Sequence, residues 1–175
     1  LPSGEPVLRA LHGVVVGDLL AFHAAPAGEK MDVVGRPAVA QATEVVAQLP
    51  SWFFDDEKAC PATTLYVSAQ AHGVVEEVTD ADVKAEALNQ LMQRFQPEGR
   101  YVPLAADHAL YRKPIRGIFV GAVRLDRVDG KAKLMQNRST EERASVMQKL
   151  WRRGDAGDCA AIERIREANP ADPAP

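Results

Sequence analysis

Cysteine, long apolar runs and an excess of positive charge are all scarce in this sequence, and each shortage excludes a class of protein. The two cysteines, Cys60 and Cys159, lie far apart and match neither a zinc-site nor a disulfide spacing, which predicts a reduced, cytoplasmic setting. No apolar run approaches the roughly 20 residues of a membrane-spanning helix. The formal net charge of −3 argues against a nucleic-acid-binding surface that depends on overall charge. We therefore expect neither a membrane protein nor a nucleic-acid-binding protein.

Recognisable catalytic and metal-binding motifs are absent as well. The sequence contains no Gly-x-Ser-x-Gly, no His-Glu-x-x-His, no Walker loop and no Rossmann glycine fingerprint. A metal site built on His12 and His23 would need a third ligand, and no residue is spaced to supply one. We expect no metal, and we interpret His72 and His108 as polar positions of a barrel.

The length and composition are those of one globular domain. At 175 residues with 46% hydrophobic content, the chain is long enough to bury a core. We predict a single domain over residues 1–175, whose part from about residue 139 is helical. The opening residues 1–6 resemble a turn, and because a turn follows a strand, we expect the natural protein to have an earlier strand.

A predicted hairpin organises the first part of the chain. Val7–Val16 is rich in β-branched residues, and Gly17-Asp18 offers a two-residue type II′ turn before a second strand, Leu19–His23. This turn places His12 opposite His23, so that both imidazoles lie on one face of the hairpin. An outer hairpin of a β-barrel accounts for the same pattern without any ligand.

A small-residue turn after the hairpin is suited to hold a phosphate group. Ala24–Gly28 leads into a short amphipathic segment, Met31–Val34, with Lys30 at its start. A lysine in the first turn of a helix adds a full charge to the exposed N–H groups there, and Arg9 on the adjoining strand offers a bidentate contact.

The remaining segments predict an α+β fold with a barrel-like sheet. Strands are predicted over residues 38–46, 64–79 and 115–128, a loop over 100–112, a turn at Asp129-Gly130, and helices over 80–95, 139–151 and 159–168. The long strand over 64–79, bent at Gly73, favours a small closed barrel. In the helix over 80–95 we expect four polar residues to point outward: Lys84, Glu86, Gln90 and Arg94.

Several short motifs occur in the order and spacing of a known family. They are Arg9-Ala10-Leu11-His12-Gly13, Phe22-His23-Ala24-Ala25, Gly28-Glu29-Lys30, Ser51-Trp52-Phe53, Cys60–Tyr66, His72-Gly73 and Gly130–Asn137. With these motifs the chain resembles the FMN-binding split barrels related to pyridoxamine 5′-phosphate oxidase. It is most similar to the flavin-nucleotide-binding branch, which includes FMN-binding negative transcriptional regulators. Nothing matches the substrate-phosphate residues of the true oxidase, so that activity is not implied.

The resemblance implies a cofactor, a site and an assembly. The fold would be a split β-barrel with peripheral helices, the cofactor FMN, and the assembly a homodimer that shares its cavity between two chains. Haem or a deazaflavin are alternatives that this fold allows. The residues implied to bind the cofactor are Arg9, Ala10, Leu11, His12, Phe22, His23, Ala24, Lys30, Tyr66, Ser68 and Gln70.

Two functions remain open from the sequence. The first is an FMN-dependent oxidoreductase that acts on an unidentified small molecule. The alternative is a non-enzymatic flavin-binding sensor or transcriptional regulator. A regulator that binds DNA itself should carry a basic helix, and the candidate residues are Arg143, Lys149, Arg152 and Arg153. A solvated helix face explains those charges equally well.

Overall fold

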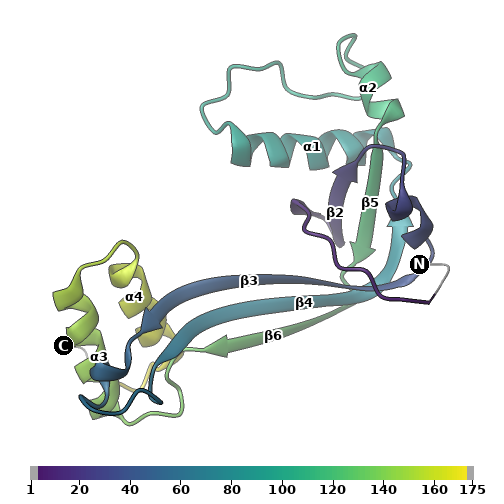
Figure 1. Cartoon of the computed structure of the whole chain (residues 1–175). Coiled ribbons are helices and arrows are strands. Elements are labelled where there is room, and N and C mark those ends of the chain that lie inside the picture. Colours follow the sequence, from purple (N-terminus) through teal and green to yellow (C-terminus); the bar gives the residue numbers. More distant parts are fainter. Residues whose placement is uncertain (1–3, 173–175) are drawn as a thin grey trace. The chain divides into compact units, whose positions relative to one another are not determined.

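The computed structural model describes residues 4–172, with the side chains of Glu29 and Lys30 excepted. The chain is α+β and builds one antiparallel sheet flanked by helices (Figure 1). The strands are β1 (Gly13–Val16), β2 (Leu19–Ala24), β3 (Pro37–Leu49), β4 (Thr63–Glu77), β5 (Phe119–Arg124) and β6 (Arg127–Lys133). The helices are α1 (Ala81–Phe95), α2 (Arg112–Gly117), α3 (Thr140–Arg153) and α4 (Asp158–Ala168), with short 3-10 turns η1 (Glu29–Val33) and η2 (Ser51–Phe53).

The strand order is β1-β2-β5-β4-β3, with β6 paired to β4. Within residues 4–172, β1 and β3 stand at the two ends of this order, so the sheet is open and the expectation of a closed barrel is wrong. Gly73 lies where β4 approaches β5: a Cβ there would come within 3.1 Å of the Arg124 carbonyl oxygen. Over this same described range, no helix is both long and apolar enough to cross a membrane.

The chain divides into two compact units, and strands β3 and β4 each contribute to both. The first unit comprises residues 1–40 and 70–128. In it α1 packs against β1 and β2, and the core consists of Val14, Ala21, Val78, Ala87, Leu91, Val120 and Ala122. Residues 119–123 of β5 are all buried, because β5 lies between β2 and β4 and is covered on its faces.

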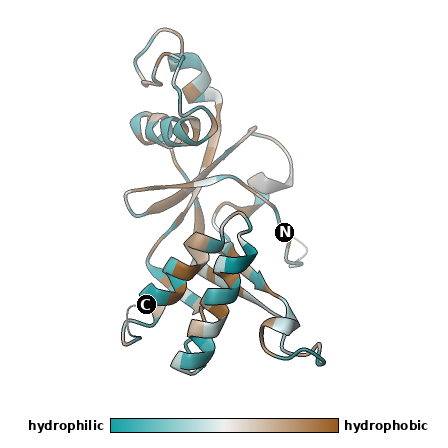
Figure 2. Cartoon of the chain, turned by 90° about the vertical axis from the view of Figure 1, so that its left-hand side faces the viewer, coloured by the Kyte–Doolittle hydropathy of each residue, from teal (hydrophilic) through white to brown (hydrophobic). Residues whose placement is uncertain are grey.

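The second unit comprises residues 41–69 and 129–175, and its core joins α3 and α4 to the adjoining strands. The most completely buried large side chains of that core are those of Leu49, Phe53, Leu65, Val146, Leu150 and Ile165. Both helices are amphipathic, and Figure 2 shows brown and teal residues on the helices near the C-terminus. Phe53 is 2% exposed, so the aromatic cluster after β3 supplies a core residue.

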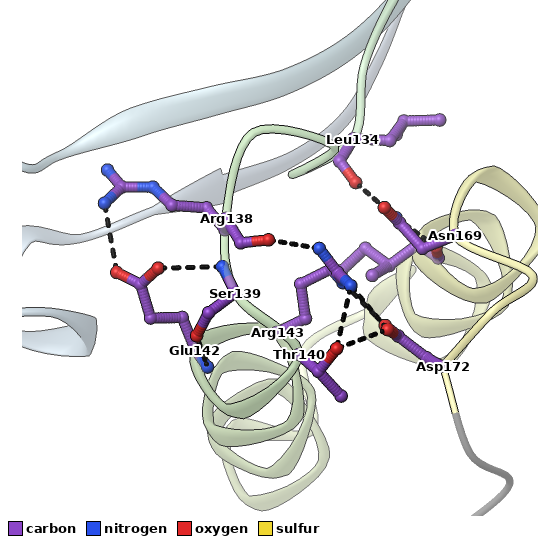
Figure 3. Close-up of polar contacts among 9 residues, drawn as sticks. Leu134, Arg138, Ser139, Thr140, Glu142, Arg143, Asn169 and Asp172 are labelled. Atoms are coloured by element: carbon purple, nitrogen blue, oxygen red, sulfur yellow. Dashed lines mark hydrogen bonds and ion pairs between the residues drawn. The ribbon is translucent and has the colours of Figure 1, made fainter.

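A polar network attaches the C-terminal turn to α3 (Figure 3). The buried guanidinium of Arg143 donates to both carboxylate oxygens of Asp172, to the Thr140 hydroxyl and to the Arg138 carbonyl. The Asn169 amide donates to the carbonyl oxygens of Leu134, at 3.1 Å, and Ile165, at 2.7 Å. These contacts close the end of the described chain onto the second unit.

The predicted hairpin turn at Gly17 and two predicted helix caps are confirmed. Gly17 has φ of +59°, and the pairs Val16–Leu19 through Gly13–Phe22 follow the predicted register. Asp80 caps α1 by accepting hydrogen bonds from the backbone N–H groups of Asp82 and Val83. Ser139 and Glu142 form the predicted capping box of α3.

Three predictions about the strands are wrong. The first strand begins at Gly13 and not at Val7, because no described strand pairs with the exposed residues 7–12. The strand predicted over 115–128 begins at Phe119, since Ile115 lies in α2, and it is interrupted before Arg127. Asp129 and Gly130 lie within β6 and do not form a turn.

Lys84 also departs from its predicted outward position. It is 6% exposed, and its Nζ donates to the carbonyl oxygen of Ile118 at 2.8 Å. This carbonyl follows α2, where the backbone leaves the helix and enters β5. A buried ammonium group requires a hydrogen-bond acceptor, and this carbonyl provides one.

Candidate functional site

The candidate site begins on β2, where Phe22, His23 and Ala24 pair with Gly121, Val120 and Phe119 of β5. Successive strand residues face opposite sides of a sheet, so Ala21 and His23 share one face and Phe22 lies on the other. Ala21 belongs to the core cluster that contains Ala87 and Leu91 of α1. The His23 imidazole is therefore on the side of α1.

Phe22 occupies the opposite face, over a glycine. Its ring lies 6.3 Å from that of Phe119, edge to face, and covers Gly121 so closely that a Cβ there would come within 2.6 Å of the Phe22 ring. Only a residue without a side chain allows the phenyl ring this position. The fit of Phe22 to β5 is thus determined by Gly121.

His12 contacts Phe95 at the end of α1, and His23 lines the same cavity as Phe95. The ring centroids of His12 and Phe95 are 5.1 Å apart, in an edge-to-face arrangement, and His23 and Phe95 line the same cavity. The direct pairing of the two histidines is wrong, because β1 ends its ladder at Gly13 and His23 pairs with Val120.

A cavity of about 300 Å³ lies beside His23 in the first unit. Helix α1 contributes Leu88, Leu91, Met92 and Phe95 to its wall. Tyr101, Leu104 and Tyr111 contribute the remainder from the segment between α1 and α2. The walls are thus almost entirely aliphatic and aromatic, and His23 supplies the one imidazole.

Hydrogen bonds to α1 hold the outer wall of the cavity. The side-chain amide of Asn89 donates to the Leu104 carbonyl at 2.7 Å and accepts from the Leu104 N–H at 2.9 Å. The Tyr111 hydroxyl donates to the Val102 carbonyl at 2.7 Å. Sequence reasoning missed this wall, because residues 100–112 show no periodicity. The one usable signal was the group of aromatic residues, Tyr101 and Tyr111, in a segment predicted as loop.

The turn after β2 has the conformation expected of a glycine turn feeding a helix. Gly28 has φ of +86°, and the Met31 N–H donates to its carbonyl at 3.0 Å. The helix is a single 3-10 segment, Glu29–Val33, and begins two residues earlier than predicted. Lys30 lies in its first turn, but its side chain is outside the described residues, so its role as a phosphate ligand stays a prediction.

The other predicted cofactor-binding residues are distributed along the chain. Arg9, Ala10 and Leu11 are exposed in the irregular segment before β1, where Arg9 Nη1 donates to the Leu8 carbonyl at 2.8 Å. Tyr66, Ser68 and Gln70 are half-buried on β4.

Of these, Tyr66 and Ser68 belong to the second unit, where the Lys131 ammonium lies 6.0 Å from the centre of the Tyr66 ring. In the first unit His12 contacts Phe95, His23 lines the same cavity as Phe95, and Phe22 faces the other side of the sheet. The complete cofactor set is therefore not assembled on one face of β2, and it stays a prediction.

An ion-pair network ties the hairpin turn to two neighbouring strands. Arg124 Nη1 lies 2.5 Å from Asp18 Oδ2, and its Nη2 lies 3.0 Å from Glu76 Oε2. Arg124 donates hydrogen bonds to the carboxylates of Glu76 and Asp18, and these bonds, with Glu76 as the larger cause, raise the pKa of Arg124, so the guanidinium stays charged. Among the described residues, no group of three or more His, Cys, Asp or Glu side chains is placed to hold a metal ion.

Comparison with known proteins identifies the family. The sequence model of the family described as pyridoxamine 5′-phosphate oxidase matches residues 1–132. The chain belongs to this family. The match includes the whole hairpin, η1, α1 and the cavity, and it ends before α3 and α4. A search among curated proteins finds no match.

Solved structures show the same fold, that of the split barrels of the pyridoxamine 5′-phosphate oxidase family. The flavocytochrome Anf3 from Azotobacter vinelandii is 18% identical with a TM-score of 0.55, over 74% of this chain and 57% of that one. The FAD and heme binding protein from Mycobacterium smegmatis is 22% identical with a TM-score of 0.58, over 83% of this chain and 68% of that one. The chain thus spans little more than half the length of the Azotobacter protein.

Proposed function

We propose that this chain binds FMN and acts as a flavin-dependent oxidoreductase on a small molecule. The observation that carries the proposal is the family match over residues 1–132, which contains the hairpin, its glycine turn and η1 without interruption.

The groups around the glycine turn fit the phosphate end of a flavin. Arg9 and Lys30 are cations on either side of the hairpin in sequence, and a guanidinium or ammonium group binds phosphate through charge-assisted hydrogen bonds. Among the side chains that the structure describes, none caps η1 at Gly28, and a Cβ at Gly28 would meet none of their atoms within 4 Å. The turn is therefore open to a ligand. A bound flavin would supply reversible electron transfer, which none of the chain's own side chains provides.

The enzymatic function is better supported than DNA binding through α3. Of the four cations in the candidate basic helix, Arg143 is buried against Asp172, and Arg153 pairs with Asp158 at 2.5 Å. Lys149 Nζ donates to the Phe53 carbonyl at 2.6 Å. These charges hold the second unit together, so they leave little of a basic surface for a phosphate backbone.

The first test is the identity of the cofactor. Among the structural neighbours, one is named a flavocytochrome and the other an FAD and heme binding protein. We expect the purified full chain to show a flavin spectrum, and the released cofactor to be FMN by chromatography and mass spectrometry. FAD in the released fraction, or a haem Soret band in place of the flavin, would contradict the FMN assignment. A protein that stays colourless after incubation with FMN would contradict flavin binding altogether.

The second test concerns turnover. Under anaerobic conditions, NADH or NADPH should bleach the flavin absorbance of the loaded protein, and an added electron acceptor should restore it. If the oxidised spectrum persists with both nicotinamides while the flavin stays bound, the sensor function becomes the better description.

A further inference from the structure

We propose that the cavity between α1 and the segment 96–111 binds a compact, uncharged aromatic molecule, with the His23 imidazole as its hydrogen-bonding partner. This site lies on the α1 face of the hairpin, opposite the face that carries Phe22. The proposal goes beyond flavin binding and rests on the cavity alone.

The size and lining of the cavity determine the class of ligand. A volume of about 300 Å³ corresponds to about ten water molecules at ~30 Å³ each, and it lies at the lower end of the range for small-molecule sites. Apart from His23, every lining residue presents aliphatic or aromatic carbon to the space. Since a charged ligand would lose its hydration there without a compensating ion pair, the walls favour a neutral molecule.

Three aromatic side chains favour a planar ring over an aliphatic chain. Phe95, Tyr101 and Tyr111 contribute rings from three different places in the sequence. Phe95 already has an edge-to-face contact with His12 at 5.1 Å, which is a preferred geometry between aromatic rings. Leu91 is 3% exposed and Phe95 is 55% exposed, so the cavity has a closed floor and opens near the end of α1.

The outer wall is held in place before any ligand arrives. Two hydrogen bonds join Asn89 to Leu104, and the Tyr111 hydroxyl is bonded to the Val102 carbonyl. Connecting segments longer than about 12–15 residues without secondary structure of their own are uncommon and are usually functional or disordered. Residues 96–111 form such a segment, and these bonds make it an ordered wall, which reduces the entropy lost on binding.

The probe is 2-naphthol, titrated calorimetrically into the purified full chain. It is planar and neutral, has about the right volume, and carries one hydroxyl group for His23. We expect saturable one-to-one binding with a Kd on the order of 0.1 mM, given its small number of atoms. Binding should be retained in the flavin-free protein. An absence of saturable binding, or binding that occurs only in the FMN-loaded protein, would overturn the proposal.

Matched tryptophan variants locate the site. Met92→Trp fills the cavity and should weaken 2-naphthol binding by at least about tenfold. Gln93→Trp adds the same side chain at the next, exposed position of α1 and should bind like the wild type. Leu104→Trp fills the cavity from the other wall, so the test holds even where Met92→Trp does not fold. Wild-type affinity in a folded cavity-filling variant would overturn the assignment.

His23→Phe tests the polar contact. Phenylalanine retains a ring but removes the ring nitrogens, and loss of one neutral hydrogen bond corresponds to about threefold to tenfold weaker binding. Unchanged 2-naphthol affinity in His23→Phe would overturn the role of the imidazole. FMN affinity is measured on the same variants. A loss of 2-naphthol binding is therefore distinguishable from a loss of flavin binding.

Discussion

Single residues determine the surface of the candidate site, and Gly121 is the clearest case. It leaves room for the Phe22 ring, which a Cβ would approach to 2.6 Å. We expect Gly121→Ala to lower the free energy of unfolding by about 1–3 kcal/mol, as overpacking does in other cores. Urea unfolding of a double-mutant cycle checks the cause: in a Phe22→Leu background the same substitution should cost less. Equal costs in both backgrounds would show that Phe22 is not the neighbour that matters.

Lys30 is the residue on which the flavin proposal makes its most specific prediction. A charge-assisted hydrogen bond to phosphate contributes roughly 1.5–3 kcal/mol, so Lys30→Ala should weaken FMN binding by about tenfold to a hundredfold in a fluorescence titration. A surface lysine without a phosphate partner would change stability by less than about 0.5 kcal/mol and leave FMN affinity unaltered.

Riboflavin provides the control for Lys30→Ala. It lacks the phosphate, so it should bind the wild type and the variant about equally, while damage to the whole pocket would weaken both ligands. Equal FMN affinity in Lys30→Ala and wild type would falsify the phosphate assignment.

At the scale of elements, the capping box of α3 allows the contribution of one helix N-cap to protein stability to be measured. The Ser139 hydroxyl accepts from the Glu142 N–H at 3.2 Å, and the Glu142 carboxylate accepts from the Ser139 N–H at 3.0 Å. Ser139→Ala should therefore lower the free energy of unfolding by about 1 kcal/mol. Ser145→Ala makes the same chemical change at an exposed position inside α3, where alanine favours helix, and should be neutral or slightly stabilising. Chemical denaturation measures both variants. If the cap contributed nothing, Ser139→Ala and Ser145→Ala would change the free energy of unfolding by the same amount.

The stability that the Arg143–Asp172 contact contributes should depend on pH, because Asp172 titrates. Hydrogen bonds from Arg143 hold the pKa of Asp172 below its ordinary value. A carboxyl group whose pKa is lower in the folded state than in the unfolded state stabilises the fold at pH values above its unfolded pKa of about 3.9. This stabilisation is lost as the pH falls through the folded pKa. Asp172→Asn should lower the melting temperature by several degrees near neutral pH, with a smaller difference in acid. Glu163→Gln, at an exposed position of α4, should show neither effect.

Elements determined by neighbours in the sequence were predictable, and those determined by distant contacts were not. The Gly17-Asp18 hairpin, the Asp80 cap and the Ser139 capping box all have their partners within a few residues. The burial of Lys84 depends on the Ile118 carbonyl, 34 residues away, and no local pattern encodes it.

The strand boundaries and the cavity could not be predicted from the sequence, for related reasons. The apolar run Ile118–Val120 is too short to show where helix gives way to strand, and Pro114 is tolerated in the first turn of α2. Leu104 owes its place to Asn89, 15 residues earlier, so the cavity wall was not visible in the pattern of residues 100–112. The hairpin half of the candidate site was predictable because its turn sets the register.

For the whole molecule, the prediction concerns assembly, and the exposed valines of the sheet are the side chains that a partner chain would cover. Val15, Val39, Val45, Val74 and Val128 lie on four strands, with Val39 and Val45 both on β3, and each is 45–59% exposed. Together with the family resemblance, they support a homodimer that shares its flavin site, and we propose a second copy of this chain as the partner.

Light scattering coupled to size exclusion tests the dimer directly. At micromolar concentration we expect twice the chain mass of 19.0 kDa, with flavin bound. Val39→Lys combined with Val74→Lys places two charges on adjacent strands, where burial in an interface would leave them unpaired, so this variant should dissociate and lose FMN together. Trp151→Lys replaces a residue that is 70% exposed on α3 and should keep both the dimer and the cofactor. A monomeric protein that still binds one flavin per chain would show that the site is complete within a single copy.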